Sequence, residues 1–383
     1  MGKKIGILTY FWADNPGTFL QAYATLYAYQ KRFPEHRVEL VDVRYRRNLF
    51  RPNRRDTSLK CLVTHWRYHR LLKRCRRQHL AMSPRGIVTQ DYEAAAAYVE
   101  AQRYDLIVVG ADEILQMLPK YLARGQPPIY WLPPSLACRK VVCAGSAGTT
   151  LYENLSEPMR HRLAESIQAY DLVGVRDDVA YTLMEQLGLK GDPRLQRVPD
   201  STFAWPIDPQ PAAEAVKRFG IDVARPTVGI NAPVNEANVL RLLDHYRSRG
   251  YQLVSLAAPS PADYWLWFIS PFEWAGIYRY FQFTLTDRFH GSAFSLRSGR
   301  LPISLDFNTQ YTAAGLSKKH SLLKEFGLAE TAHINVDRVK DFDELLARCD
   351  AAIAAFDAGK ALDTAAQLGR KYEAFLDQVA GLL

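Results

Sequence analysis

FTLTDRFHGSAFS, residues 283–295, joins a β-rich run to a short apolar segment through a polar turn. The run Phe281–Leu285 predicts a strand, and the segment Ala293–Leu296 predicts part of a helix. The corner between them sets Arg288 and His290 two residues apart, where the amides of a helix start point outward. Such a corner can hold an anion and move a proton.

Each residue of this corner also has a purely structural interpretation. Arg288 can pair with its neighbour Asp287, and His290 can be a hydrogen-bonded core residue. However, a guanidinium group suits a carboxylate or phosphate, and an imidazole exchanges protons near neutral pH. Gly291 allows close approach of the backbone. Because these residues follow one strand end, we favour a shared ligand site with Arg288 and His290 as catalytic residues.

Other predicted strands also end in small or polar residues. These strands are predicted from Lys4 to Tyr10, Tyr104 to Gly110, Lys140 to Cys143 and Leu172 to Val175. The residues that follow them include, in the same order, Asn15 and Gly17, Asp112, Ser146, and Arg176. Carboxyl ends of parallel strands lie along one edge of a sheet, where ligands bind. The loop at Asn15 also suits a plain turn, and Arg176 can pair with Asp177 or Asp178. The agreement among the segments nevertheless predicts an α/β fold with a ligand-binding edge.

The chain of 383 residues is too long for one ordinary core, so two domains are expected. The proline-rich stretch 205–212 fits a linker. We therefore expect an N-terminal domain over residues 1–205 and a C-terminal domain over residues 206–355. Residues 356–383 are expected to form a helix that packs back across both domains, with Gly359 between it and the preceding helix.

The net charge of +9 is concentrated in one segment. Residues 44–79 hold 13 Lys and Arg and a single acid, Asp56, so the rest of the chain is slightly acidic. This segment can be a solvated surface, or it can bind an anionic partner such as a phosphate-bearing substrate or an anionic membrane face. Nucleic acid is not expected, because no recognised binding motif accompanies the charge.

The composition predicts a cytoplasmic protein, with a peripheral position at the inner membrane face left open by the basic segment. No run of about 18 apolar residues exists, and the N-terminus reads as a strand rather than a secretory signal. Five cysteines without zinc-ligand spacing are expected to be reduced thiols. His65 and His69 lie four residues apart but have no third ligand, so we expect no metal.

Several motifs in order resemble those of the polysaccharide pyruvyl transferase family. The family's opening loop and helix are similar to Asn15–Thr18 and Leu20–Ala24. Later family motifs are similar to four further stretches: Asp105–Glu113, Cys143–Gly148, Val175–Asp177 and Asp200–Thr202. The family's Arg/Ser-Phe-His-Gly, after a threonine, is found as Arg288–Gly291 after Thr286. The resemblance covers roughly residues 4 to 330.

The resemblance implies two Rossmann-like domains that face each other across a cleft, as in GT-B glycosyltransferases. It also implies transfer of the pyruvyl group of phosphoenolpyruvate to a sugar as a ketal, in cell-surface polysaccharide or related biosynthesis, without a cofactor. The first domain is then the acceptor side and the second the donor side. The implied donor-binding residues are Arg176, Arg288, Gly291 and Ser146, and the implied acceptor-binding residues are Asn15, Gly17 and Asp112.

This chain departs from the family's pattern in the first-domain loops. Pro16 replaces the family's tyrosine and Thr18 its alanine, and Gly110–Glu113 replaces Gly-Ser-Asp-Gln. The acceptor therefore stays open: a lipid-linked, nucleotide-linked or polymeric sugar, or a non-sugar group. A nucleotide-sugar glycosyltransferase on the same fold is the alternative function, and a non-catalytic binder of anionic polymer is a third.

Overall fold

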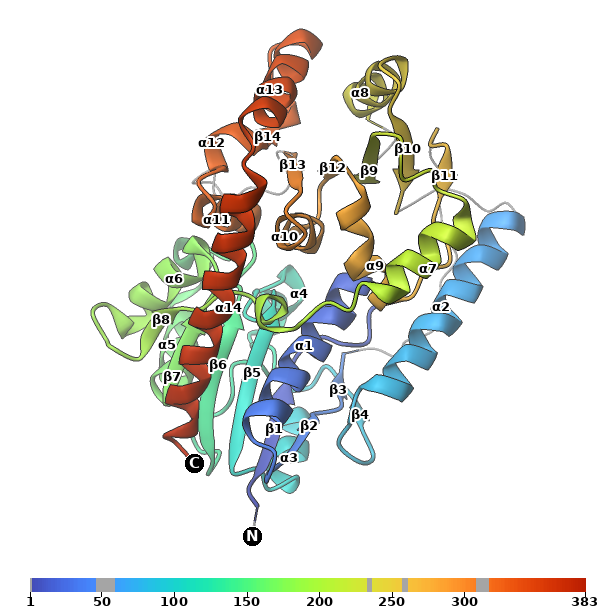
Figure 1. The fold of residues 1–383 in the computed structure, drawn as a ribbon. Coiled ribbons are helices and arrows are strands. Elements are labelled where there is room, and N and C mark those ends of the chain that lie inside the picture. The colour runs from blue at the N-terminus through green and yellow to red at the C-terminus, as the bar shows by residue number, and fades with distance from the viewer. Residues whose placement is uncertain (1, 46–58, 233–235, 257–260, 308–316) are drawn as a thin grey trace.

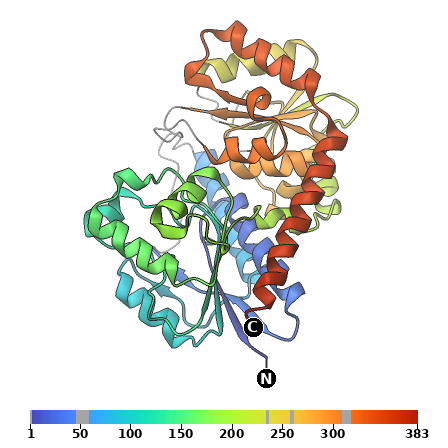
Figure 2. The same cartoon turned by 90° about the vertical axis from the view of Figure 1, so that its left-hand side faces the viewer.

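The computed structural model describes residues 2–45, 59–232, 236–256, 261–307 and 317–383. It contains two six-stranded parallel sheets, each flanked by helices, and the two halves lie one above the other (Figures 1 and 2). The strand order is β2-β1-β5-β6-β7-β8 in the first sheet and β11-β10-β9-β12-β13-β14 in the second. The predicted α/β class with two Rossmann-like domains is confirmed.

The first half agrees with most of the predicted elements. The strands and helices are β1 Lys4–Leu8, α1 Pro16–Arg32, β2 Arg37–Leu40, β3 Val43–Arg44, α2 Leu59–His79, β4 Ile87–Val88, α3 Tyr92–Ala101, β5 Leu106–Asp112, α4 Pro119–Arg124, β6 Arg139–Gly145, α5 Glu157–Gln168, β7 Leu172–Val175, α6 Asp178–Met184 and β8 Leu195–Arg197. The run VELVDV, residues 38–43, predicts one strand, but the structure divides it, because β3 leaves the main sheet to pair with β4.

The second half repeats the arrangement. Its elements are α7 Gln210–Phe219, β9 Thr227–Asn231, α8 Ala237–Ser248, β10 Gln252–Ser255, β11 Tyr264–Trp265, α9 Pro271–Ile277, β12 Phe283–Thr286, α10 Phe289–Arg297, β13 Leu301–Asp306, α11 Lys318–Glu325, α12 Ala329–Ala332, β14 His333–Asn335, α13 Phe342–Ala355 and α14 Ala358–Ala380. Two details of the prediction are wrong. The end of the predicted linker already belongs to α7, and the break before the last helix lies at Asp357, which caps α14, so Gly359 lies inside the first turn.

The corner that follows β12 owes its shape to a glycine. Strand β12 is fully buried, and α10 starts at Phe289, one residue after Arg288. A Cβ atom on Gly291 would lie 2.3 Å from the hydroxyl oxygen of Thr286. Only glycine therefore lets the first turn of α10 pack so closely against the end of the strand.

The two domains share buried contacts on two sides. Tyr23 of α1 contacts Phe272 of α9 edge-to-face, with ring centroids 5.1 Å apart. Helix α14 runs along both halves (Figure 2), with Tyr372 in the core that includes the first sheet and Leu368 in a cluster with Phe289 and Leu296. Because these contacts are apolar and buried or partly buried, they stabilise one relative placement of the two sheets.

Candidate active site

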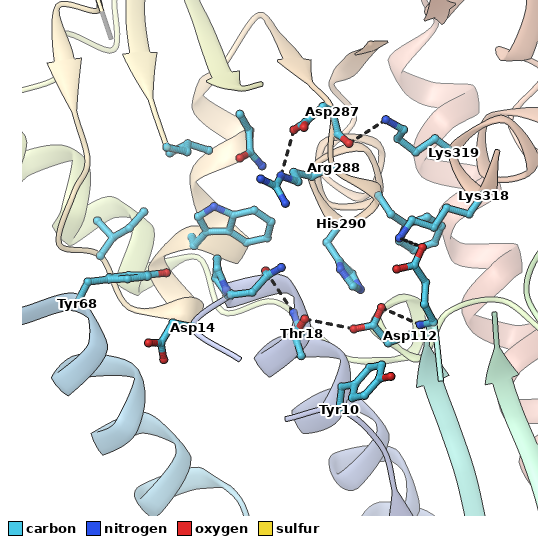
Figure 3. A pocket seen from close by; sticks show the side chains of 18 of the residues that line it. Tyr10, Asp14, Thr18, Tyr68, Asp112, Asp287, Arg288, His290, Lys318 and Lys319 are labelled. Carbon is cyan, nitrogen blue, oxygen red and sulfur yellow. Dashed lines mark hydrogen bonds and ion pairs between the residues drawn. The ribbon is translucent and has the colours of Figure 1, made fainter. Parts of the chain in front are cut away.

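The carboxyl ends of strands from both sheets meet at a cavity of about 600 Å³ (Figure 3). Residues of both domains and of α2 line it. Those with polar or aromatic side chains include Tyr10, Asp14, Asn15, Thr18, His65, Tyr68, Asp112, Glu113, Trp265, Trp267, Asp287, Arg288, His290, Lys318 and Lys319. The site residues predicted from separate motifs, Asn15, Asp112, Arg288 and His290, are thus brought together.

The first-domain side of the cavity is built on the start of α1. The side chain of Asn15 caps this helix by accepting a hydrogen bond from the amide of Gly17 at 2.9 Å. The hydroxyl of Thr18 donates to the carboxylate of Asp112 at 3.2 Å. Asp112 adopts a φ of 74°, which an L-residue rarely takes, at the end of β5. The loop and the strand end are therefore held together as one surface.

Gly17 packs directly against His290 of the other domain. A Cβ atom on Gly17 would lie 2.6 Å from Nδ1 of His290, well inside van der Waals contact. His290 is 8% exposed and lines the cavity. A residue predicted on the acceptor side is thus in contact with the predicted acid or base.

Asp200 is a site residue that the sequence analysis did not select. Its Oδ2 lies 3.7 Å from Nε2 of His290 and accepts a hydrogen bond from Arg176 at 2.5 Å. Burial alone would raise the pKa of Asp200, but His290 and Arg176 reverse the effect and hold that pKa well below its usual range. An ionised Asp200 behind the ring helps to fix the orientation of the imidazole. The match of residues 200–202 to a family motif was the available signal.

Arg176 lies behind the site rather than in the cavity. Its side chain is 1% exposed, and its guanidinium group stacks 4.2 Å from the ring centroid of Phe289. It lines a second cavity of about 410 Å³, which lies on the other side of Phe289. Burial would lower the pKa of Arg176, but the carboxylates of Asp200 and Asp112 raise it above its ordinary value. The direct donor contact expected for Arg176 has no support in this geometry, and its contacts suit a positioning role.

Ser146 and Gly291, both predicted to bind the donor, are also absent from the lining of the first cavity. Ser146 is fully buried, and its hydroxyl accepts a hydrogen bond from the amide of Gly148 at 3.3 Å. Gly291 is buried in the first turn of α10, where its role is to allow close packing. Ser146 therefore shapes a loop, whereas Gly291 can reach a ligand only through its amide.

Three cationic side chains line the cavity from the second domain; Lys319 is buried and paired with Asp306, whereas Arg288 and Lys318 are more exposed. The side chain of Arg288 is 60% exposed, and its Nε lies 3.1 Å from the carboxylate of Asp287, so it pairs with its neighbour and still faces the cavity. Lys318 reaches across to the first domain, with its Nζ 2.9 Å from the carboxylate of Glu113 (Figure 3). Sequence analysis missed Lys318, because nothing in a lone lysine at a helix start indicates which domain it faces.

Part of the basic segment forms another side of the cavity. His65 and Tyr68 of α2 line it. The helix is held in place by Asp14, which lies 2.6 Å from Nδ1 of His69 and 3.1 Å from a guanidinium nitrogen of Arg76. His69 is therefore bound by a carboxylate of the first loop, which lies 55 residues away in sequence.

Other features bear on the class of protein. In the part of the chain that the structure describes, no group of three or more His, Cys, Asp or Glu side chains is placed to hold a metal ion. The same residues include no helix both long and apolar enough to cross a membrane. Of the five cysteines, the four with described side chains are not in disulfide bonds; Cys61 is outside this set.

Solved structures with the same architecture define the class of fold. The UDP-GlcNAc 2-epimerase from Neisseria meningitidis bound to UDP-GlcNAc has a TM-score of 0.54 at 8% identity, covering 100% of both chains. Anabaena Alr3699/HepE in complex with UDP has a TM-score of 0.55 at 12% identity and covers 100% of both chains. S. aureus MnaA with UDP gives 0.55 at 11% identity, covering 100% of this chain and 98% of that one. The protein is thus an α/β protein of the GT-B type, with its site between two Rossmann-like domains.

The family follows from the sequence match. The polysaccharide pyruvyl transferase family matches residues 15–307, more than half of the chain. The chain belongs to this family, which indicates a transferase, and the predicted resemblance is confirmed. No match was found among curated proteins.

Proposed function

We propose that the protein transfers the pyruvyl group of phosphoenolpyruvate to a sugar as a ketal. The observation that supports this most is the corner at the start of α10. There an exposed guanidinium group, that of Arg288, faces the same cavity as His290, and the ionised Asp200 stands behind the imidazole. An anion-binding group beside a proton donor is what this reaction requires.

The donor has two anionic groups, a phosphate and a carboxylate, and besides Lys319, which is buried against Asp306, the second-domain side of the cavity offers two cations. We assign these groups to Arg288 and Lys318, which both line the cavity. The amides of the first turn of α10 add partial positive charge, because Arg288 at the N-cap gives them no side-chain hydrogen bond. Arg176 then acts indirectly, through Asp200, by orienting His290.

The chemistry balances with one proton donor and one leaving phosphate. A proton goes to the methylene carbon of phosphoenolpyruvate, which becomes a methyl group and leaves C2 electrophilic. One acceptor hydroxyl adds at C2, the C–O bond to phosphate breaks with its electron pair on phosphate, and the second hydroxyl closes the ketal. Of the two hydroxyl protons, one replaces the proton given to carbon and the other leaves with phosphate. His290 serves either as the acid toward carbon or as the base toward the hydroxyl.

The acceptor is proposed to lie against the first-domain loop, near Asn15 and Asp112. A nucleotide-linked sugar fits with the UDP and UDP-GlcNAc bound by two proteins of similar fold, and lipid-linked or polymeric sugars present the same hydroxyl groups. Transfer to a non-sugar acceptor is the variant of this proposal that the altered loop allows. We place the reaction in the cytoplasm, where phosphoenolpyruvate serves as donor substrate without a cofactor.

A thermal-shift series tests the donor. Phosphoenolpyruvate should raise the Tm of the wild-type protein, because a ligand that binds only the native state stabilises it. Arg288→Ala should abolish most of this shift, whereas Arg370→Ala, which removes an exposed arginine on α14, should leave it unchanged. His290→Ala should keep the shift and lose about 100-fold or more in phosphate release with an active acceptor. Wild-type turnover in His290→Ala would exclude this role.

A nucleotide-sugar glycosyltransferase is the second candidate, because the same fold binds UDP in Anabaena Alr3699/HepE. The same assay separates the two functions. Stabilisation by UDP- or GDP-sugars alone, with no response to phosphoenolpyruvate, would favour the glycosyltransferase.

A further inference from the structure

Helix α2 presents one continuous stripe to solvent. Leu59, Val63 and Trp66 recur at intervals of four and three residues, so they lie on one face of the helix. All three are exposed, Leu59 to 77% and Trp66 to 44%. Exposed large apolar side chains grouped on one helix face indicate a binding surface.

The same stripe continues into positive charge. Arg70 follows Trp66 by one turn, and its guanidinium carbon lies 4.8 Å from the centroid of the indole ring. Arg67 beside it, and Lys73, Arg74 and Arg77 beyond it, are also exposed, and residues 59–79 include no acid. Over roughly 27 Å of helix the surface thus changes from apolar to basic. Helix α2 lies at the outer edge of the molecule, on the side away from α14 (Figure 1).

We propose that this stripe of α2 docks on an anionic lipid bilayer. Lysine and arginine side chains near the surface attract anionic headgroups. The apolar end, with its tryptophan, suits the boundary between headgroups and acyl chains. A soluble polyanion would use the basic half but would leave Leu59, Val63 and Trp66 exposed to water, so the observations favour the membrane. The apolar end enters the interface and the basic half lies against the headgroups.

The opposite face of α2 places the active site beside that bilayer. Thr64, His65 and Tyr68 line the large cavity, whereas Val63 and Trp66, their sequence neighbours, point to solvent. A helix that touches the membrane is therefore also one side of the cavity. This geometry assigns the acceptor to sugars linked to a membrane lipid. The assignment of the acceptor rests on the proposed function, whereas membrane docking itself does not.

Vesicle sedimentation tests the docking. Vesicles of phosphatidylcholine with about one-third phosphatidylglycerol should bind the full-length protein at physiological salt, and vesicles of phosphatidylcholine alone should bind it far less. Neutralising two basic residues, in Arg70→Gln with Arg74→Gln, should lower the partition coefficient about 30-fold, since each contributes roughly fivefold. The matched control is Lys360→Gln with Arg370→Gln, two exposed basic residues of α14.

A second set of variants tests the apolar end of the stripe. It compares Val63→Ser with Trp66→Ser, made together, against Val223→Ser as a control at another exposed valine. The first should weaken vesicle binding at least tenfold and the second should not. Equal binding of all variants would overturn the proposal. Stronger binding to dextran sulfate than to vesicles at the same salt, unaffected by substitution of Trp66, would also overturn it. That result would assign the surface to a soluble polyanion.

A thermal shift with phosphoenolpyruvate keeps the two proposals apart. The α2 variants should retain the shift, which also shows that they are folded. An α2 variant that loses vesicle binding but keeps a normal thermal shift has lost only the docking surface. Normal vesicle binding without any shift in the wild-type protein would reject the proposed donor and leave the docking surface standing.

Discussion

Replacing Gly17 with alanine should disable the site with a single methyl group. The added Cβ atom would lie 2.6 Å from Nδ1 of His290, and ordinary contact begins near 3.4 Å. The imidazole or the loop must therefore move by about 0.8 Å, and a displacement near 1 Å in a reacting group typically costs on the order of 100-fold in rate. We expect a loss of that order in turnover, measured by phosphate release.

The Gly17→Ala protein should otherwise behave normally. The three atoms nearest to the added Cβ all belong to His290 rather than to Arg288 or Lys318, so the thermal shift with phosphoenolpyruvate should persist. Overpacking should cost roughly 1–3 kcal/mol in the free energy of unfolding, measured with urea. Gly110→Ala is the matched control, because there the nearest atom lies at an ordinary 3.4 Å.

A double-mutant cycle isolates the contact. In a His290→Ala background the ring is gone, so Gly17→Ala should cause no further loss of turnover. A wild-type rate for Gly17→Ala would refute the reasoning. So would an equal additional loss in both backgrounds, because the methyl group would then act on something other than His290.

Three further outcomes follow from contacts at and near the site. The pKa of Asp200 is depressed in the native state, so its ionised form stabilises the fold above the unfolded-state pKa of ~4, and that stability is lost as pH falls toward the native pKa. Asp200→Asn should reduce this pH dependence, measured by urea unfolding between about pH 5 and 2. At pH 7 the substitution should cost about 3–5 kcal/mol in the free energy of unfolding, because Arg176 loses its buried partner. Lys318→Gln should raise KM for phosphoenolpyruvate about tenfold with little change in kcat, in steady-state kinetics. Ser270→Ala removes the capping box of α9 and should cost about 1 kcal/mol in unfolding without altering turnover.

Much of the fold could be predicted because its strands are continuous apolar runs with small or polar residues at their ends. The strand predicted over residues 172–175 has the observed bounds. The failures are short elements such as β8 and β14, three residues each, whose pairing at a sheet edge is decided by neighbours distant in sequence. Likewise, the helix break at Asp357 depends on a cap, which is stronger than the preference of Gly359 to end a helix.

The site could be predicted only in part, for a different reason. Sequence placed Arg288 and His290 at a strand end, where topology alone fixes the cavity edge. It could not distinguish an arginine that faces the cavity from one behind it, because Arg176 follows its strand in the same way yet is buried between Asp200 and Phe289. Lys318 was missed for the converse reason: its partner Glu113 belongs to the other domain.

The two departures from the family's loop have a joint physical effect on the acceptor side. Pro16 occupies the first turn of α1, a position where proline fits because no amide is needed there, and it fixes φ next to the capping Asn15. Thr18 adds a hydroxyl that an alanine lacks and uses it to hold the carboxylate of Asp112. The family's tyrosine ring is thus absent at position 16, while Thr18 ties the loop to the strand end. Asn15, Pro16 and Thr18 line the same cavity as His65 and Tyr68 of α2. We therefore expect the acceptor of the proposed reaction to contact both the first loop and α2, the helix whose opposite face is basic and exposed.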